Sequence, residues 1–212
     1  MTTKLQVYKN ALLLLKESSA LTITVSTDSV AVNTLNAVYA SALAFVLENG
    51  KWNFAARSVS IEAETDVEPA FGYDSAFEKP DDYCNLIKIS ASSTFYPPFD
   101  SGAYVDEGNF WYANIDPLYV SYVSNHASYG GDLSLWPQIV AGALEHELAF
   151  RAAPSVTSMG EQAMDQLEKK KNRALLKAKS WDAAKQPPEQ LAPSRLALAR
   201  KGKASWREGW WP

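Results

Sequence analysis

The hydrophobic period of this 212-residue chain changes twice, and that change constrains the fold more than any other feature of the sequence. Residues 4–17 and 29–48 place apolar side chains three and four positions apart, which predicts two antiparallel amphipathic helices joined by a loop. Residues 58–64 alternate apolar and polar side chains, which predicts a half-buried strand. The helical period returns at 134–152 and again at about 158–184. The pattern predicts an α+β protein with strands inserted between two pairs of helices.

The middle of the chain is expected to form a small antiparallel sheet. Residues 84–91 and 118–123 are further strand candidates, and 104–112 predict a hairpin around Glu107-Gly108-Asn109. Residues 65–83 contain two prolines and a glycine, and this segment is predicted to be an ordered but irregular crossing.

Breaker and capping residues mark the expected ends of the helices. Asp28 or Ser29 is placed to cap the second helix, and Gly50 is expected to end it. Pro154 is predicted to end the third helix, and Ser158 with Glu161 matches a capping box at the start of the fourth. The expected organisation is a helical bundle made of 1–56 and 132–185, an inserted β-rich domain at 57–131, and an extended C-terminal arm at 186–212.

The charge is distributed unevenly along the chain. Residues 1–156 carry 8 Lys/Arg and 18 Asp/Glu, a net charge of −10, whereas residues 157–212 carry 12 and 6, a net charge of +6. The basic end is suited to docking on an acidic partner, on a neighbouring copy of the acidic body, or on nucleic acid. A solvated helix face followed by a frayed tail is the alternative.

The arm combines cations with tryptophans. Disordered segments are normally poor in aromatic residues, and Trp and Arg dominate the energetics of protein interfaces. We therefore predict that the arm orders when it binds a partner. The residues predicted to make contact are Arg195, Leu196, Leu198, Arg200, Lys201, Lys203, Trp206, Arg207, Trp210 and Trp211.

No arrangement of residues typical of catalysis or metal binding is recognisable in the sequence. The chain has one cysteine, Cys84, and two histidines. The segment Glu145-His146-Glu147 lacks the second histidine of a His-Glu-x-x-His zinc site, because position 150 is Phe. Walker loops, dinucleotide fingerprints and nucleophile elbows are absent. We expect neither an enzyme nor a cofactor, and no segment that spans a membrane.

Two stretches of the sequence resemble a known family. Trp52-Asn53-Phe54-Ala55 follows the second helix, and after an acidic strand residues 69–82 read Pro-x-Phe-Gly-Tyr-x-x-x-Phe-x-x-Pro-x-Asp. This order resembles tail tubular protein A, the head–tail adaptor family of tailed bacteriophages, and the resemblance covers most of residues 4–185. The residues that carry it are Trp52, Asn53, Phe54, Pro69, Phe71, Gly72, Tyr73, Phe77, Pro80 and Asp82.

The resemblance implies a structural virion protein, assembled in the host cytoplasm and located at the head–tail junction. Such proteins form a ring, commonly of twelve copies, below the portal protein. The ring extends a channel through which DNA passes without sequence-specific binding, and it offers a surface to the tail nozzle. The family fold is a helical bundle with a small β domain, and C-terminal arms reach between portal subunits.

The motif residues themselves are expected to pack rather than to touch partners. Trp52 is expected to lie where the helical pair meets the sheet, because a large aromatic residue beside a turn buries much area. A nucleic-acid-binding module that uses the basic residues of 157–212 is the alternative function.

Overall fold

The computed structural model of the protein describes residues 2–17, 23, 29–67, 69, 72–95 and 102–185. The predicted arm, 186–212, lies outside these residues. In chain order the elements are α1 (Lys4–Leu14), α2 (Val30–Glu48), η2 (Asn53–Ala55), β1 (Ala56–Ile61), β2 (Ser75–Glu78), β3 (Tyr83–Ser90), β4 (Tyr104–Glu107), β5 (Phe110–Ala113), β6 (Leu118–Ser124), η3 (Leu133–Leu135), α3 (Gln138–Val156) and α4 (Glu161–Ala183).

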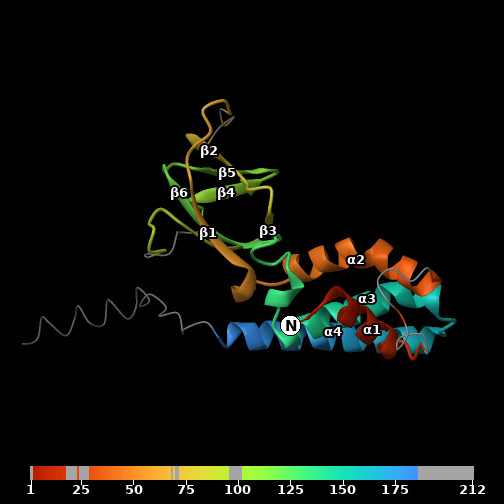
Figure 1. Ribbon diagram of the computed structural model, residues 1–212. Coiled ribbons are helices and arrows are strands. Elements are labelled where there is room, and N and C mark those ends of the chain that lie inside the picture. The colour runs from red at the N-terminus through yellow and green to blue at the C-terminus, as the bar shows by residue number, and fades with distance from the viewer. Residues whose placement is uncertain are drawn as a thin grey trace, which may run out of the picture.

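The four α-helices form a helical lobe, and the strands form a β lobe that stands at one end of it (Figure 1). The β lobe contains two three-stranded antiparallel sheets, in the orders β1-β6-β3 and β2-β5-β4. The predicted α+β fold, with a β domain between two helical pairs, is confirmed. The sequence predicted one sheet where the structure has two, because β2 falls inside the predicted irregular crossing.

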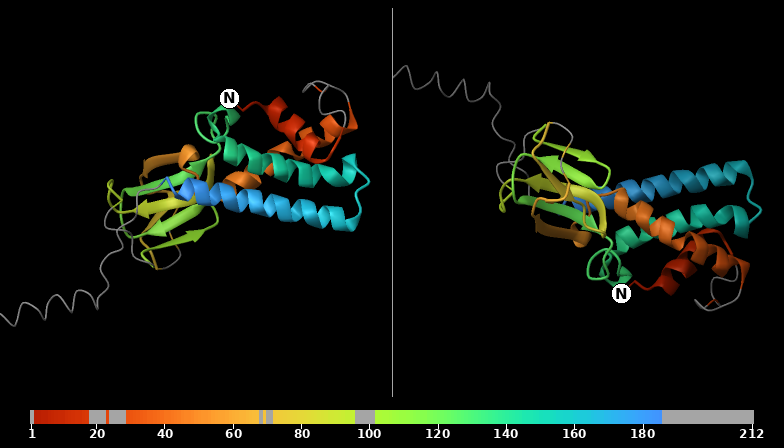
Figure 2. Two further views of the ribbon diagram at one scale, coloured as in Figure 1. Left: turned by 90° about the horizontal axis from the view of Figure 1, so that it is seen from below. Right: turned by 90° about the horizontal axis from the view of Figure 1, so that it is seen from above.

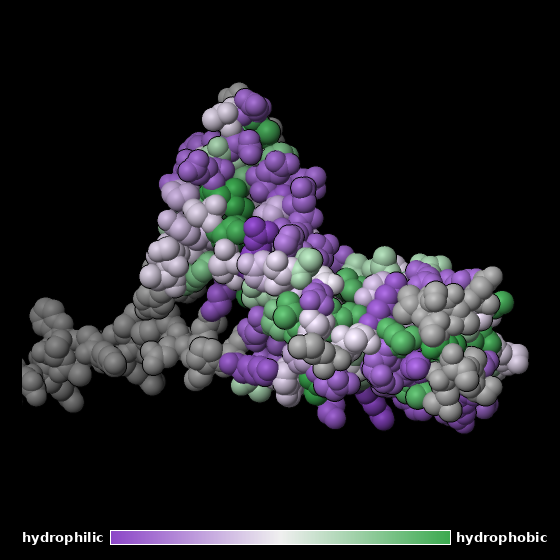
Figure 3. All heavy atoms as spheres, in the orientation of Figure 1, coloured by the Kyte–Doolittle hydropathy of each residue, from purple (hydrophilic) through white to green (hydrophobic). Residues whose placement is uncertain are grey.

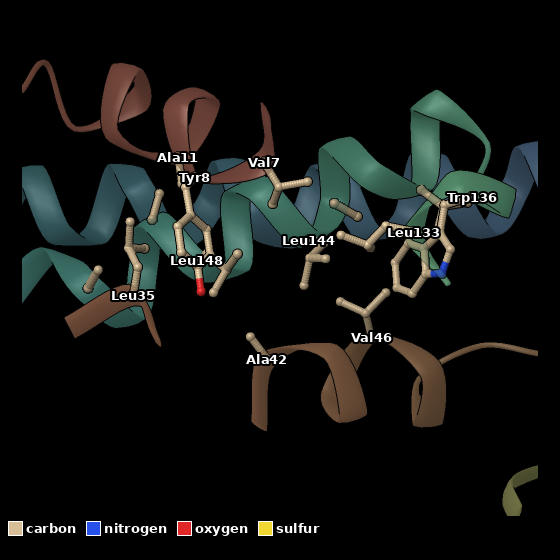
Figure 4. Close-up of a cluster of buried hydrophobic side chains, with 14 of the residues drawn as sticks. Val7, Tyr8, Ala11, Leu35, Ala42, Val46, Leu133, Trp136, Leu144 and Leu148 are labelled. Atoms are coloured by element: carbon tan, nitrogen blue, oxygen red, sulfur yellow. The ribbon is translucent and has the colours of Figure 1, made fainter. Parts of the chain in front are cut away.

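Helix α3 is the centre of the helical lobe. It contacts α1, α2 and α4, and both views of Figure 2 show α3 and α4 running side by side. Apolar side chains from the other helices converge on it, including Tyr8 from α1 and Val46 from α2 (Figure 4). The Tyr8 hydroxyl donates to Oδ1 of Asn36 at 2.9 Å, so the polar end of this buried ring has a partner.

A buried ionic cluster joins α3 to its neighbours. The Glu147 carboxylate accepts from Nε of Arg151 at 2.6 Å and lies 3.8 Å from Nζ of Lys171 on α4. Arg151 also donates to the Ser41 hydroxyl of α2 at 2.8 Å. The Lys171 ammonium lies 4.3 Å from the centroid of the Phe150 ring, which adds a cation–π contact. Lys171, part of the lysine run at 169–171, therefore packs inside the lobe.

Trp52 closes the junction between the lobes, as its sequence context predicted. Its side chain is buried, and its indole Nε1 donates to the Val46 carbonyl at the end of α2 at 2.7 Å. Phe54 lies between Trp52 and Trp136, with ring centroids 6.1 Å and 5.3 Å apart. Gly50 has ordinary backbone angles, and its need for glycine comes from space: a Cβ there would collide with the indole of Trp52.

Several predicted boundaries are wrong, each for a local reason. The first helix ends at Leu14, because Lys16 takes a positive φ of 62°. The Lys16 and Glu17 amides donate back to Leu13 and Leu12, which is a Schellman ending. Pro154 does not end α3, which continues to Val156.

The predicted start of the last helix and the first strand also differ from the structure. Gly160 caps α4 without a side-chain hydrogen bond, so the capping box of Ser158 and Glu161 is not formed. Strand β1 begins at Ala56, two residues before the predicted start, and ends at Ile61. The predicted hairpin around Gly108 is confirmed, with β4 and β5 on either side of it.

Helix α2 meets the length and composition of a membrane span, with a mean hydropathy of 1.7 over an 18-residue window. This match rests on length and composition alone, and the expectation that no segment spans a membrane stays a prediction. Five residues of α2 are buried in the helical lobe: Val32, Leu35, Ala42, Val46 and Leu47.

The fit of Trp52 against Gly50 gives a testable prediction. We expect Gly50→Ala to lower the free energy of unfolding by about 1–3 kcal/mol, because the buried indole would have to shift and strain its hydrogen bond to the Val46 carbonyl. Gly142→Ala is the control, because a Cβ there meets nothing within 4 Å. In the interior of α3 that change should raise stability by about 0.5–1 kcal/mol. Urea unfolding of both variants measures their free energies of unfolding. Equal unfolding midpoints for Gly50→Ala and Gly142→Ala would contradict the close packing of Trp52 on Gly50.

Candidate functional site

The motif residues in the described part of the chain meet the rest of the molecule at two aspartates. Asp182, in the last turn of α4, is held by Asn53, and it lies four residues before the predicted arm, at a position called the arm root below. Asp82, at the start of β3, is held by residues of β1 and β6. Between them these two carboxylates tie the motif to the helices and to the sheet.

The arm root is fixed by three hydrogen bonds between Asn53 and Asp182. The backbone N–H of Asn53 donates to Oδ2 of Asp182 at 3.0 Å. The side-chain Nδ2 of Asn53 donates to the same Oδ2 and to the Asp182 carbonyl, each at 3.0 Å. Asp182 is 4% exposed. Burial raises the pKa of its carboxyl, and the Asn53 amide and Lys185 offset part of that rise. A carboxylate at the C-terminal end of a helix opposes the helix dipole, so it needs these donors.

A hollow of about 390 Å³ lies beside this contact, between the end of α2, the start of β3 and the end of α4. Its lining includes Trp52, Lys179 and Asp182. Next to it the Lys185 ammonium lies 3.6 Å from the centroid of the Trp181 ring. The last residue before the predicted arm is therefore held against the end of its own helix, α4.

Asp82 accepts hydrogen bonds from three side chains. Arg57 Nη1 donates at 2.8 Å, the Tyr122 hydroxyl donates at 2.8 Å, and the Ser124 hydroxyl donates to Oδ2. Burial alone would raise the pKa of the Asp82 carboxyl. The hydrogen bonds from Ser124, Arg57 and Tyr122 together outweigh that effect and hold the pKa below its usual range. The Asp82 carbonyl also accepts from the amide of Asn125 at 3.0 Å. Asp82 thus fixes β1, β6 and the start of β3 to one another.

The remaining motif residues support the β lobe. Phe77 is fully buried in the core of this lobe. The Pro80 carbonyl accepts a hydrogen bond from the backbone N–H of Tyr83 in the turn before β3. Gly72 takes a positive φ of 89°, which favours glycine. The Tyr73 hydroxyl donates to the carbonyl of Gly102 at 3.1 Å. Pro69 is half-buried.

Some predicted residues fall outside the described part of the chain. Phe71 is one of them, and so are all the predicted contact residues of the arm, from Arg195 to Trp211. The structure therefore places the motif residues of 52–54 at the junction between the lobes and those of 72–82 in the β lobe, and it leaves the arm residues as predictions.

Sequence reasoning missed the partners of the two aspartates. Arg57, Tyr122 and Ser124 are far from Asp82 in sequence, and only the pairing of β1 and β3 with β6 brings them to it. Asp182 did carry a signal in the sequence. It is an acidic residue in the last turn of a helix whose preceding turns are rich in lysine, where the dipole disfavours it.

The described residues provide no group of three or more His, Cys, Asp and Glu side chains that could hold a metal ion. Burial raises the pKa of the Cys84 thiol to about 11, with smaller contributions from Glu48 and Asp82. A thiol with that pKa is a poor nucleophile near neutral pH. His146 is hydrogen-bonded within α3, since its Nδ1 lies 2.8 Å from the Gly142 carbonyl.

A comparison of the chain with models of protein families and with curated proteins finds no match.

The Asp82 cluster predicts a pH-dependent loss of stability. Asp82→Asn should lower the free energy of unfolding by about 2 kcal/mol near neutral pH, because charged hydrogen bonds to Arg57 and Tyr122 are lost. The folded pKa lies below the unfolded one, so this contribution is present above the unfolded pKa of about 4 and is lost as the pH falls through the folded value. Asp81→Asn, at the exposed neighbouring position, is the control. Chemical unfolding at pH 7 and pH 3 tests this, and a difference from wild type that is equal at both pH values would contradict it.

The contact at the arm root predicts a local effect. Asn53→Ala should remove the two side-chain hydrogen bonds to Asp182, at a cost of about 1–2 kcal/mol, and should speed amide exchange in the last turn of α4. Ser180→Ala, at an exposed position in the same turn, should leave exchange there unchanged. Hydrogen exchange read by mass spectrometry distinguishes the two, and slow exchange in both variants would show that the contact does not hold the helix end.

Proposed function

We propose that this protein is a structural head–tail adaptor of a tailed bacteriophage. In this proposal twelve copies form a ring at the head–tail junction, joined to the portal protein on one side and to the tail nozzle on the other. The ring extends the DNA channel, and the C-terminal arm of each copy docks between portal subunits. The protein acts by assembly and not by catalysis.

The observation that carries the proposal is the place of Asn53. This residue belongs to the stretch that resembles the adaptor family, and it binds Asp182 at the root of the predicted arm. The neighbouring motif residue Trp52 joins the end of α2 to the junction between the lobes. An arm that must carry load between two rings needs a rigid attachment to its own subunit, and these contacts provide one.

The charge distribution supports the same proposal. Residues 57–131 carry 3 Lys/Arg and 12 Asp/Glu, a net charge of −9. Figure 3 shows hydrophilic side chains over much of the visible face of the β lobe. An acidic surface does not retain DNA, because each phosphate neutralised by a cation adds affinity and would slow passage.

A specific observation favours the alternative, a nucleic-acid-binding module. Four cationic residues of α4 are exposed: Lys169, Lys170, Arg173 and Lys177. Such a row can neutralise phosphates, and binding through it would weaken steeply with salt. The acidic β lobe opposes this function.

The first experiment measures the mass of the full-length protein in solution with and without the portal ring of the same phage. We expect binding at one copy per portal subunit. A full-length variant with Trp206, Trp210 and Trp211 changed to alanine should lose at least tenfold in affinity, because Trp side chains of this kind are typical interface anchors worth about 2 kcal/mol or more.

The matched control is a full-length variant with Lys169, Lys170 and Arg173 changed to glutamine. It should still bind the portal, and in the alternative function it should lose affinity for a DNA duplex at low salt. The adaptor proposal would be refuted if the wild-type protein did not bind the portal ring and instead bound duplex DNA through these three residues.

A further inference from the structure

Strand β1 has a free edge. It pairs with β6 on one side, and in the described part of the chain no other strand lies beside it. Within the same residues, the backbone of Arg57–Ile61 makes no hydrogen bond beyond those to β6. An open strand edge is a template for a further strand, and natural proteins usually cover or blunt it.

An open hollow of about 740 Å³ lies against this strand. Half-buried Val59 and Ile61 of β1, with Tyr122 of β6, give it an apolar lining. Four exposed acidic residues also line it: Glu62, Glu64, Glu78 and Asp81. The hollow therefore offers an apolar lining, a free row of backbone groups and a negatively charged border.

The two cations of the hollow already have partners. Arg57 is paired with Asp82 at 2.8 Å, and Lys79 is paired with Asp106 at 2.6 Å. Among the described residues, no ion pair neutralises Glu62, Glu64, Glu78 or Asp81. Carboxylates that line one hollow repel one another, so a cationic occupant would relieve that repulsion.

The chain itself contains a segment with the matching chemistry. Residues 195–201 read Arg-Leu-Ala-Leu-Ala-Arg-Lys. In an extended conformation Leu196 and Leu198 would share one face, which suits the apolar lining, while three cations at the two ends would meet the carboxylates. The arm as a whole, 186–212, carries 5 Lys/Arg and 2 Asp/Glu.

The arm root lies close enough for its own chain to fill the hollow. Asp182 binds Asn53, and β1 begins three residues after Asn53, at Ala56. Arg195 is ten residues beyond Lys185, and ten extended residues span about 35 Å. The six residues of β1 span about 20 Å. Tethering at this distance gives an effective concentration in the millimolar range, which favours the arm of the same chain over that of another copy.

We propose that residues 195–201 of the arm dock on the outer edge of β1 of their own chain as an added strand. The inference goes beyond the adaptor function and does not depend on it. Docking of this segment leaves the tryptophans at 206–211 beyond the strand, and it shields an open sheet edge in the free protein. Any partner that binds residues 195–201 has to displace them from the β lobe.

Hydrogen exchange on the full-length protein tests the proposal without any partner. The amides of residues 57–61 on the outer edge of β1 should exchange about tenfold faster in the variant L196D/L198D than in the wild type, as expected when a strand docked about nine-tenths of the time is lost. The variant W210A/W211A, changed in the same arm beyond the docking segment, should match the wild type. Equal exchange in wild type and L196D/L198D would overturn the proposal.

Charge variants test the border of the hollow. E62Q/E64Q/E78Q should speed exchange in residues 57–61, whereas the control D74N/E107Q, at exposed acidic positions of the β lobe outside the lining, should not. An equal effect of the two variants would contradict specific docking.

Disulfide trapping identifies the source of the strand. In a C84S background, a cysteine at Ser60 combined with one at Ala197 or Ala199 should give a cross-linked product of monomer mass. A cross-linked product of dimer mass would refute docking on the same chain and assign the hollow to a neighbouring copy. The absence of any cross-link would refute docking altogether.

Discussion

Strand β6 carries two hydrophobic cores, and the arrangement of the whole molecule depends on it. Neighbouring residues of a strand point to opposite faces, so Val123 packs with the helices while Tyr122, Val120 and Leu118 pack against the second sheet. A one-residue slip of β6 would exchange the two faces and disrupt both cores at once. Asp82 opposes that slip, because it holds Tyr122 and Ser124 on either side of Val123.

The junction between the lobes follows from that constraint. The core of the helical lobe reaches β6 through Val123 and reaches the end of α2 through Trp52. The second sheet adds Trp111, whose ring meets Tyr83 at 5.2 Å between centroids, and whose indole donates to Asp106 at 3.0 Å. Residues 104–129 contain seven Phe, Trp and Tyr residues, and two of them, Trp111 and Tyr122, are fully buried in this core.

Much of this architecture could be predicted from the periodicity of the sequence. Four helices, the hairpin at Gly108 and the strands near 84–91 and 118–123 all have patterns long or sharp enough to recognise. Strand β2 could not be found in that way, because it has four residues and lies between turn-forming residues. The ends of α1 and α3 were also misplaced, since Lys16 in a left-handed conformation and Pro154 within a helix run against the residue preferences on which such predictions depend. The partners of Asp82 and Asp182 required the tertiary fold, because each pair joins distant segments.

The Asn53–Asp182 contact also defines a path for mechanical force. A pull on the chain beyond Lys185 first reaches the last turn of α4, and Asp182 passes it to Asn53 through hydrogen bonds. Three residues later the chain enters β1, which is paired with β6 along its whole length. Tension along β1 would shear all six of its pairings with β6 together instead of opening them one by one. The residues just before the predicted arm are thus coupled, through β1, to β6, the strand that carries both cores.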